Sequence, residues 1–296
     1  MTAAALRLGF MGFGESAELF ATDLSRAGIT AISAYSPSGA KARPGDAVYA
    51  RAQNAGVTLV KTPAELARRA DLIFALTQGK TALSAARKIV KSLKPHHLYV
   101  DGSTNSAAAM EKIAALIGDR AQFVDAAIMA PVAVARLKTP LVASGPQATA
   151  FRDALAPFGM DIRVVSDIPG AASAMKLIRS VFMKGLAALL FESMEAAHRR
   201  GMLDVCAEDI SATFDAIPFR KILKRYICST PAHAGRRVHE MKESLDMLQS
   251  INSRDRMTRA TAAFIKEFAG SGLDKQFPQE ADSVRDVLDA WITVKK

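Results

Sequence analysis

The chain has 296 residues, of which 50% are hydrophobic and 23% are charged. This length suits two domains, and the composition indicates a soluble globular protein and excludes a largely disordered one. The 39 Lys and Arg exceed the 29 Asp and Glu, but the excess is spread along the sequence. Nucleic-acid-binding proteins usually concentrate their basic residues, so we expect no nucleic-acid partner and either attraction of small anions or a positive surface that only aids solubility.

Cysteine usage and hydropathy narrow the class further. Cys206 and Cys228 are the only cysteines, too few for a disulfide framework, and no His, Cys or carboxylate pattern suggests a metal site. A reducing, cytoplasmic location is therefore expected. The apolar run 1–14 leads directly into glycines and is interpreted as a first strand, and no window reaches the ~18–20 apolar residues that a membrane span needs.

Short apolar runs alternate with helical segments as far as residue 165, which predicts a doubly wound, mostly parallel sheet covered on both faces. The predicted strands are 5–11, 29–35, 56–60, 71–77, 97–103, 122–129, 140–145 and 161–165, and the predicted helices are 15–28, 63–70, 82–93 and 106–118.

Beyond Pro169 the strand signals stop. The remaining sequence is helical in pattern, with breaks expected at Gly201, near Pro218, near Pro231 and around 270–272. We therefore predict an α/β domain over residues 1–166 and an all-α domain over 167–296.

The first predicted strand is followed by a glycine-rich turn of the G-x-G-x-x-A form, which begins at Gly12 and ends at Ala17. Gly12 allows a tight turn, Gly14 lets the backbone approach a pyrophosphate, and the following helix N-terminus attracts the anion. The alternative is a plain glycine turn that Ser16 caps. The strand-turn-helix context favours a dinucleotide-binding Rossmann domain. Its expected cofactor contacts are Gly12, Phe13, Gly14, Glu15 and Ser16, with the Glu15 carboxylate pointing away from the phosphates.

The end of the second strand bears on the choice of cofactor. NAD enzymes usually place an Asp or Glu there for the ribose 2′-hydroxyl, and this sequence has none. Ser36, Ser38, Lys41 and Arg43 follow instead and suit a 2′-phosphate. NADP is therefore favoured over NAD, although a loop with Lys and Arg is also typical of a solvated surface.

Hydroxyl residues follow the strands 71–77 and 97–103. In open parallel sheets the carboxyl ends of the strands face the ligand crevice, which puts Thr77, Ser103 and Thr104 near the reactive end of the cofactor. The alternative for Ser103 and Thr104 is capping of the helix 106–118.

The helical segment 171–200 is apolar nearly all round, so we expect it to be buried. Lys176, Ser180 and Lys184 form one polar line on it, flanked by Arg179. Burial beside other cations lowers the pKa of an amine, which suits a general acid/base near neutral pH. Lys176 is the predicted catalytic residue. The alternative is a lysine that reaches solvent or pairs with a buried carboxylate.

A basic segment with two histidines lies further along the helical half. His233 is a candidate to contact substrate, but His233 and His239 among arginines are also typical of a solvated helix face.

Four landmarks in order resemble the β-hydroxyacid dehydrogenase family, which includes 3-hydroxyisobutyrate and 6-phosphogluconate dehydrogenases. They are GFMGFG at 9–14, VDGST at 100–104, FVDA at 123–126 and the helix start at 170–176. The resemblance implies that Ser103 contacts the substrate carboxylate and that Lys176 is the acid/base. Ser180 stands where the family has an asparagine.

The sequence departs from the family pattern at two places. Ala107 replaces the usual proline after the D-x-S-T motif, and residues 125–131 align with the D-A-P-V-S-G-G substrate loop without its serine and glycines. This removes a backbone cradle for a carboxylate, leaves Met129 in the substrate loop, and puts the standard hydroxyacids in doubt. The chain is interpreted as an atypical branch with a divergent helical domain.

Together these features predict an NADP-dependent oxidoreductase that moves a hydride to or from the hydroxyl-bearing carbon of a small, anionic, hydroxyacid-like substrate. Arg179, Lys184 and His233 are candidates to hold its anionic group. The alternatives are imine reduction, oxidative decarboxylation of a sugar acid, and a non-catalytic NADP-binding regulator or scaffold. The apolar helical half predicts a homodimer or higher homo-oligomer.

Overall fold

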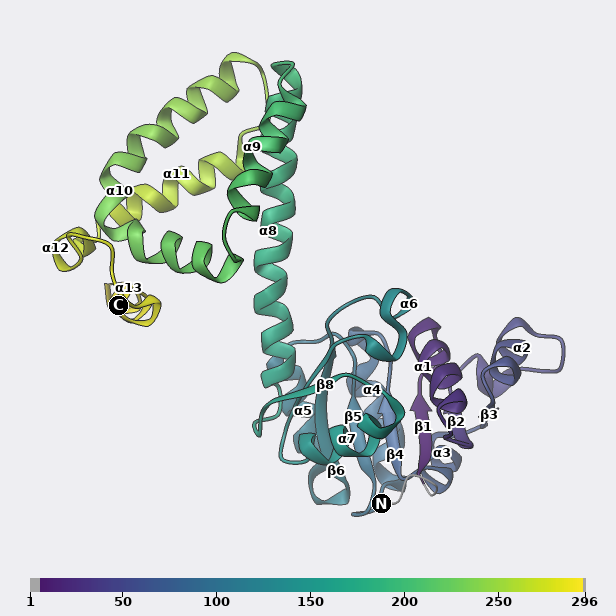
Figure 1. Cartoon of the computed structure of the whole chain (residues 1–296). Helices are drawn as coiled ribbons and strands as arrows, with labels where there is room; N and C mark the ends of the chain where they lie inside the picture. Colours follow the sequence, from purple (N-terminus) through teal and green to yellow (C-terminus); the bar gives the residue numbers. More distant parts are fainter. Residues whose placement is uncertain (1–5, 295–296) are drawn as a thin grey trace. The chain divides into compact units, whose positions relative to one another are not determined.

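The computed structural model describes residues 6–294, shown as a ribbon in Figure 1. The chain forms two compact units that divide within helix α8 (Ala171–Arg199), between Ser180 and Val181.

The first unit is built on one eight-stranded sheet with the order β3-β2-β1-β4-β5-β6-β7-β8. All neighbouring strands are parallel except β6 and β7, which are antiparallel. This confirms the predicted Rossmann-like fold class. The strands are β1 (Arg7–Met11), β2 (Ala31–Tyr35), β3 (Val57–Leu59), β4 (Leu72–Ala75), β5 (Leu98–Asp101), β6 (Gln122–Ile128), β7 (Leu141–Ser144) and β8 (Ile162–Ser166).

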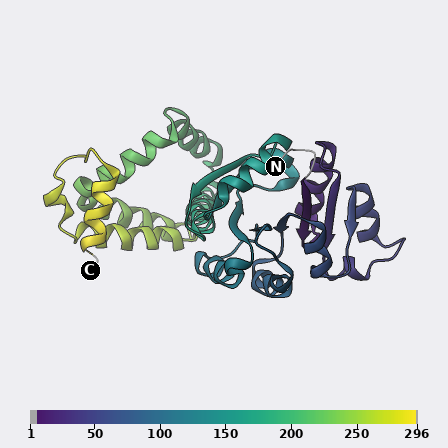
Figure 2. The ribbon, with the colours of Figure 1, turned by 90° about the horizontal axis from the view of Figure 1, so that it is seen from below.

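Helices cover both faces of this sheet because each carries one apolar stripe (Figures 1 and 2). The core on one face takes in α1 (Glu15–Arg26), α2 (Ala47–Asn54) and α7 (Ala148–Leu155). The core on the other face takes in α3 (Pro63–Arg69), α4 (Gly79–Ile89) and α5 (Ala107–Ile117). Phe74 of β4 packs against Phe10, Phe20 and Phe151 at the centre of the first core.

Three helices of this unit lie in stretches for which the sequence predicts none: α2, α6 (Val132–Ala135) and α7. All three are short, so the apolar period spans too few turns to be recognised. In α7 the buried positions Ala148, Phe151 and Leu155 still follow a helical spacing. The loop after β2 contains one short 3-10 turn, Gly39–Lys41.

The second unit is helical throughout its described part and has a small core around Ala234, Phe268 and Val287. Its helices after α8 are α9 (Leu203–Asp215), α10 (Phe219–Ser250), α11 (Arg256–Ala269), α12 (Leu273–Gln276) and α13 (Val284–Val294). No helix in the described residues is both long enough and apolar enough to cross a membrane.

Helix breaks occur at three of the four predicted places. Helix α8 ends just before Gly201, α10 begins after Pro218, and α11 ends before Gly270. The prediction of a break near Pro231 is wrong, because α10 continues through this buried proline. An interior proline removes one backbone hydrogen bond and usually bends the helix rather than ending it when packing holds both sides, and α10 is visibly bent in Figure 1.

Candidate functional site

A cavity of about 530 Å³ lies at the carboxyl edge of the sheet in the first unit. The strand order reverses between β1 and β4, and ligands of doubly wound sheets bind at such a reversal. The walls come from the start of α1, the segments after β4, β5 and β6, and Lys176 of α8. The lining residues are 14–17, 76–78, Gly102, Thr104, 128–132 and Lys176.

The glycine turn leaves the N-terminus of α1 open to this cavity. Gly12 has φ +106°, and a Cβ there would lie 2.3 Å from the carbonyl oxygen of Leu76. At Gly14, the N-cap of α1, a Cβ would meet no heavy atom within 4 Å, and no side chain caps the helix. Unpartnered N–H groups at a helix start attract phosphate oxygens, so the turn fits the pyrophosphate of a dinucleotide.

Of the other residues predicted to contact the cofactor at this turn, two line the cavity and one is buried in the core. Glu15 and Ser16 line the cavity, whereas Phe13 is buried in the core between β1 and α1. Glu15 is exposed at the first turn of α1, where its carboxylate has room to turn toward solvent.

A smaller cavity of about 170 Å³ is lined in part by Gly12 of the glycine turn. Tyr35 and Pro37 at the end of β2 form one wall, and Thr77 belongs to both cavities. The opposite wall is the polar side of α4, with Thr81, Ser84 and Lys88. These three residues were not predicted from the sequence, although their spacing of three and four positions marks one helix face.

The four residues predicted to hold a 2′-phosphate line neither of these two cavities. The Ser36 hydroxyl is buried, accepts a hydrogen bond from the Gly39 N–H at 2.9 Å and lies 3.3 Å from the Ser38 hydroxyl. Lys41 and Arg43 are exposed on the same loop. Lys88 is the cation that reaches the smaller cavity.

Lys176 lies in the wall of the larger cavity. Its Nζ donates a hydrogen bond to Thr104 Oγ1 at 2.7 Å, which joins α8 to the segment after β5. Ser180, one turn further along α8, is half-buried and does not line the cavity. Arg179 donates to the carbonyl oxygen of Met129 at 3.3 Å and thereby holds the segment after β6.

Ser103 is buried and faces away from the cavity that its neighbour Thr104 lines. Its N–H and hydroxyl donate to Asp101 Oδ1 at 2.9 and 2.6 Å. Burial raises the pKa of Asp101 to about 6, against the effect of these hydrogen bonds. Asp101 therefore fixes the backbone that presents Thr104.

Asp125 fixes the start of α8 in a similar way, through hydrogen bonds. It accepts hydrogen bonds from the Ser173 N–H at 2.9 Å, the Ser173 hydroxyl at 2.7 Å and the Ser144 hydroxyl at 3.2 Å. Ser144 in turn accepts from the Ala172 N–H at 2.9 Å. Burial raises the pKa of Asp125, while these donors oppose the shift. The first turn of α8 is thus capped by the sheet.

Asp101 and Asp125 were not predicted as site residues. They end up side by side because β5 and β6 are paired in register at these two positions. Their signal in the sequence is an acidic residue within each of two consecutive apolar strands, at the end of β5 and in the middle of β6.

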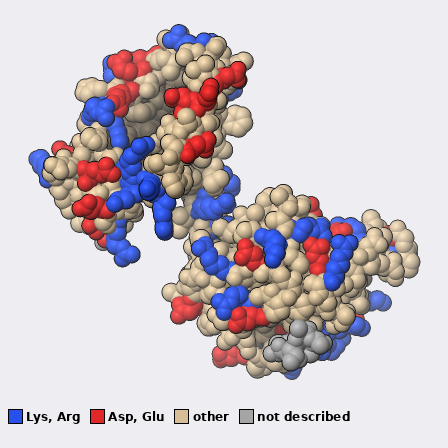
Figure 3. All heavy atoms as spheres, viewed as in Figure 1, with Lys and Arg blue, Asp and Glu red and all other residues tan. Residues whose placement is uncertain are grey.

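Lys184 and His233 belong to the second unit, where both are exposed, and neither lines the cavity described above. Lys and Arg lie on both units in the face shown in Figure 3, with acidic side chains among them. The net positive charge is therefore not concentrated in one strip of that face.

The middle of α8 is exposed in the single chain. Leu177, Ile178, Val181, Phe182, Met183 and Phe191 are all more than a third accessible, with Phe191 at 82%. The prediction that this helix is buried is therefore wrong for one chain, because the described elements leave these side chains partly accessible, although Phe182 makes an edge-to-face contact with Phe219 of α10. An apolar surface of this kind marks an interaction site.

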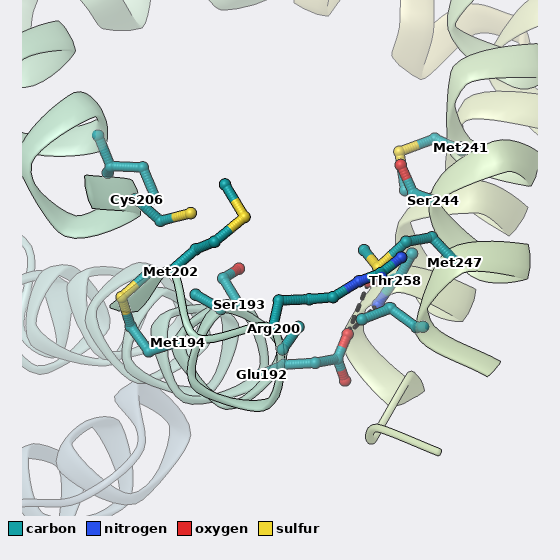
Figure 4. A pocket seen from close by; sticks show the side chains of 14 residues that line it. Glu192, Ser193, Met194, Arg200, Met202, Cys206, Met241, Ser244, Met247 and Thr258 are labelled. Carbon is teal, nitrogen blue, oxygen red and sulfur yellow. Dashed lines mark hydrogen bonds between the residues drawn. The ribbon is translucent and has the colours of Figure 1, made fainter. Parts of the chain in front are cut away.

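The second unit contains a cavity of about 480 Å³ between α8, α9, α10 and α11 (Figure 4). Methionines 194, 202, 241 and 247 contribute to its lining. Glu192 accepts hydrogen bonds from the N–H groups of Met257 and Thr258, both at 2.8 Å, and so caps the start of α11. No residue predicted from the sequence lines this cavity.

Two family descriptions match the sequence. Residues 7–162 match the NAD binding domain of 6-phosphogluconate dehydrogenase, and residues 197–268 match a domain of unknown function, DUF1932. An uncharacterized 28.5 kDa protein of Methanothermus fervidus is 28% identical over 88% of this chain and 98% of its own length.

Solved structures share the fold over nearly the whole chain. A conserved protein of unknown function, described as structurally similar to 3-hydroxyacid dehydrogenases, is 31% identical over 90% of this chain and 97% of its own, with a TM-score of 0.62. A variant of the imine reductase of Myxococcus stipitatus in complex with NAD+ has a TM-score of 0.76 at 17% identity, over 96% of this chain and 99% of its own. The same reductase with NADP+ gives a TM-score of 0.72 at 18% identity, over 95% and 99%.

Proposed function

Because the chain belongs to the family of the 6-phosphogluconate dehydrogenase NAD-binding domain, we propose that it is an NADP-dependent oxidoreductase acting on a small hydroxyacid-like substrate. One observation carries the proposal. The same cavity contains the open N-terminus of α1 and the amine of Lys176, 2.7 Å from Thr104. A dinucleotide site and a proton-transferring group thus share one space.

Charge supports NADP as the cofactor. The end of β2 offers no carboxylate for a ribose 2′-hydroxyl, whereas Lys41 and Arg43 lie on the loop after β2 and Lys88 of α4 lines the smaller cavity. A 2′-phosphate binds through charge-assisted hydrogen bonds to such groups. The Myxococcus imine reductase is solved with NADP+ and, as a variant, with NAD+, so this fold accepts either cofactor.

The chain's own residues supply the binding and the proton transfer. When bound, the nicotinamide supplies or accepts the hydride. The N–H groups at the start of α1 hold the pyrophosphate, and Thr104 holds the Lys176 amine over the cavity. Lys176 then takes the proton of the substrate hydroxyl in oxidation, or gives a proton to the carbonyl oxygen in reduction.

The substrate side of the cavity is mainly apolar. Residues 128–132 supply its wall, and Ser103, which the family resemblance assigns to a carboxylate, donates to Asp101 instead. We propose that Thr104 and Lys176 make the polar contacts to the substrate and that Arg179 shapes the apolar wall through Met129.

Imine reduction is the second candidate function. The apolar wall favours it, because an imine substrate needs no carboxylate cradle, and imine reductases share this fold. A lysine acid/base speaks against imine reduction, since such sites often carry a different residue there, and the substrate that is turned over distinguishes the two functions.

A panel of hydroxyacids, polyols, ketones and cyclic imines, followed through NADPH absorbance, tests the proposal. We expect turnover of at least one hydroxyl or carbonyl compound, and Lys176→Ala to lower kcat by about 10²–10⁴ with NADPH affinity unchanged. Lys112→Ala, an exposed lysine of α5, is the matched control. Turnover of imines alone favours the second candidate. NADPH binding without turnover of any compound contradicts both and leaves a non-catalytic NADP-binding regulator.

We also propose that the exposed apolar residues of α8 are covered by a second copy of the chain. Ile178, Val181 and Phe191 are each more than two thirds accessible, and a face of this size and character rarely stays exposed on a monomer. Self-association through a two-fold axis is the commonest way to cover it.

A further inference from the structure

A polar cavity of about 260 Å³ lies at the amino edge of the sheet, the edge opposite to the proposed cofactor site. It is formed where β1 and β2 begin, beside β3 and the last turn of α3. Its polar lining is basic and hydroxylic: Arg7, Arg68, Arg69, Thr30, Ser33 and Thr58. We propose that this cavity binds a phosphate group, either free phosphate or a phosphomonoester, independently of the cofactor.

The three arginines differ in how they are engaged. Arg7 forms a two-point ion pair with Asp71, with Nε at 2.9 Å from Oδ2, and also donates to the Arg68 carbonyl oxygen at 3.4 Å. Arg69 forms an ion pair with Glu65, with Nε 3.4 Å from Oε1. The exposed Arg68 guanidinium has no hydrogen-bond or ion-pair partner in the described part of the chain.

The local charge therefore favours an anion. Three guanidinium groups face two carboxylates, Asp71 and Glu65, which leaves one positive charge in excess. The Arg7 guanidinium lowers the pKa of Asp71, so this carboxylate stays ionised and keeps Arg7 in place. Arg68 remains available for a ligand, and guanidinium groups bind phosphate oxygens in a fork geometry.

Ser33 is the second, independent observation. Its side chain is buried, with 4% of the residue accessible, and its hydroxyl has no hydrogen-bond partner. It lines the cavity at the position where β2 pairs with Gly9 and Thr58. Buried hydroxyls are almost always bonded, so an unpartnered one in a cavity wall indicates a missing acceptor or donor.

The close packing around Ser33 makes a hydroxyl an unusual side chain at this position. Helix α3 lies so close to the sheet here that a Cβ on Gly9 would be 2.8 Å from the Ala70 Cβ. An aliphatic residue is the usual occupant of such a half-buried strand position. Thr30 and Thr58 are exposed around Ser33 and add two further hydroxyls to the wall.

A phosphate group satisfies these donors better than a carboxylate does. Its oxygens point in tetrahedral directions, so they can accept from Arg68 on one side and from the hydroxyls of the strands on the other. The site is on the opposite edge of the sheet from the N-terminus of α1, so its ligand does not require the dinucleotide pocket.

The test is a titration of the full-length protein with inorganic phosphate, with methyl phosphate as a second arm, at ionic strength held constant with chloride. Binding to the native state raises the thermal midpoint. We expect a saturable rise that chloride does not give, and Arg68→Ala to weaken phosphate binding about tenfold. Arg87→Ala, an exposed arginine of α4, is the control and should leave it unchanged. A stronger effect of methyl phosphate identifies a phosphomonoester, and an equal effect identifies free phosphate.

Ser33→Ala separates a ligand-binding hydroxyl from a structural one. We expect weaker phosphate binding with a thermal midpoint in chloride equal to or above that of the wild type, because the variant removes a buried polar atom without a partner. A lower midpoint in chloride contradicts the proposal, since the hydroxyl would then have a structural partner. Phosphate binding that equals that of Arg87→Ala in both Ser33→Ala and Arg68→Ala also contradicts it.

Repeating the titration at saturating NADPH separates the two edges of the sheet. The proposal predicts that phosphate still raises the midpoint. Loss of the phosphate effect would mean that phosphate occupies the dinucleotide pocket and would overturn the proposal, whereas the proposed oxidoreductase function would stand.

Discussion

At the scale of single residues, the site depends on two buried carboxylates that hold reactive groups in place. Asp101 presents Thr104 through Ser103, and Asp125 holds the start of the helix that carries Lys176. Neither carboxylate lines the cavity. Their role is therefore to fix positions, and we propose that Lys176 and Thr104 are the groups that contact the ligand.

The raised pKa of Asp101 predicts a pH-dependent stability. The carboxyl titrates near 3.8 when unfolded and at about 6 when folded. Between these pH values the unfolded state loses a proton that the folded state keeps, so the free energy of unfolding falls as pH rises, and above about pH 6 the loss is complete. Asp101→Asn removes this effect. We expect the variant to gain at most about 3 kcal/mol over the wild type between pH 4 and pH 7.

Denaturant unfolding at a series of pH values measures that difference. Asp119→Ala, which changes an exposed aspartate, is the control and should follow the wild type at every pH. A constant difference between Asp101→Asn and the wild type across this range would show that Asp101 is ionised throughout.

Residue roles were harder to predict than residue positions. The glycines and Lys176 follow from local spacing, and the structure puts Gly14, Thr77, Thr104 and Lys176 in the wall of one cavity. The orientation of Ser103 depends on Asp101, and that of Lys88 on the way α4 packs. The direction in which each of these side chains points depends on such contacts, and no local sequence pattern predicts it.

At the scale of elements, helix α8 begins with its first N–H groups bonded to the sheet. Asp125→Ala removes the acceptor for Ser173 and leaves buried donors without partners. We expect amide hydrogen exchange in residues 171–176 to accelerate at least about tenfold, because the first turn loses a cap.

Exchange followed by mass spectrometry checks this expectation. Asp125→Asn keeps one acceptor oxygen and should give a smaller increase, and exchange in α1 should not change in either variant. Equal exchange in Asp125→Ala and the wild type would mean that packing alone holds the start of α8.

Strands and long helices followed from the sequence because their hydrophobic periods extend over enough residues to be recognised. All eight predicted strands are present, and the described chain has no strand after Ser166. The short helices α2, α6 and α7 and the continuation of α10 through Pro231 were missed. These depend on tertiary packing, which outweighs the local preference.

At the scale of the whole molecule, an apolar helix that is exposed in one chain predicts self-association. Ile178→Glu places a charge on this face, and we expect it to shift the protein from dimer to monomer in light scattering coupled to size exclusion. Val134→Glu changes a valine of α6 that is even more exposed than Ile178 and should leave the dimer intact. A wild-type protein that is monomeric at micromolar concentration would contradict the proposed dimer.

Dinucleotide binding is the first property to measure, because the experiment requires no knowledge of the substrate. NADPH and NADH are titrated separately, and the rise of the thermal midpoint is followed. We expect a clear rise with NADPH, a smaller one with NADH, and a reduced NADPH effect in Lys88→Ala. A larger effect of NADH would contradict the NADP preference, and no effect of either nucleotide would contradict the proposed oxidoreductase function itself.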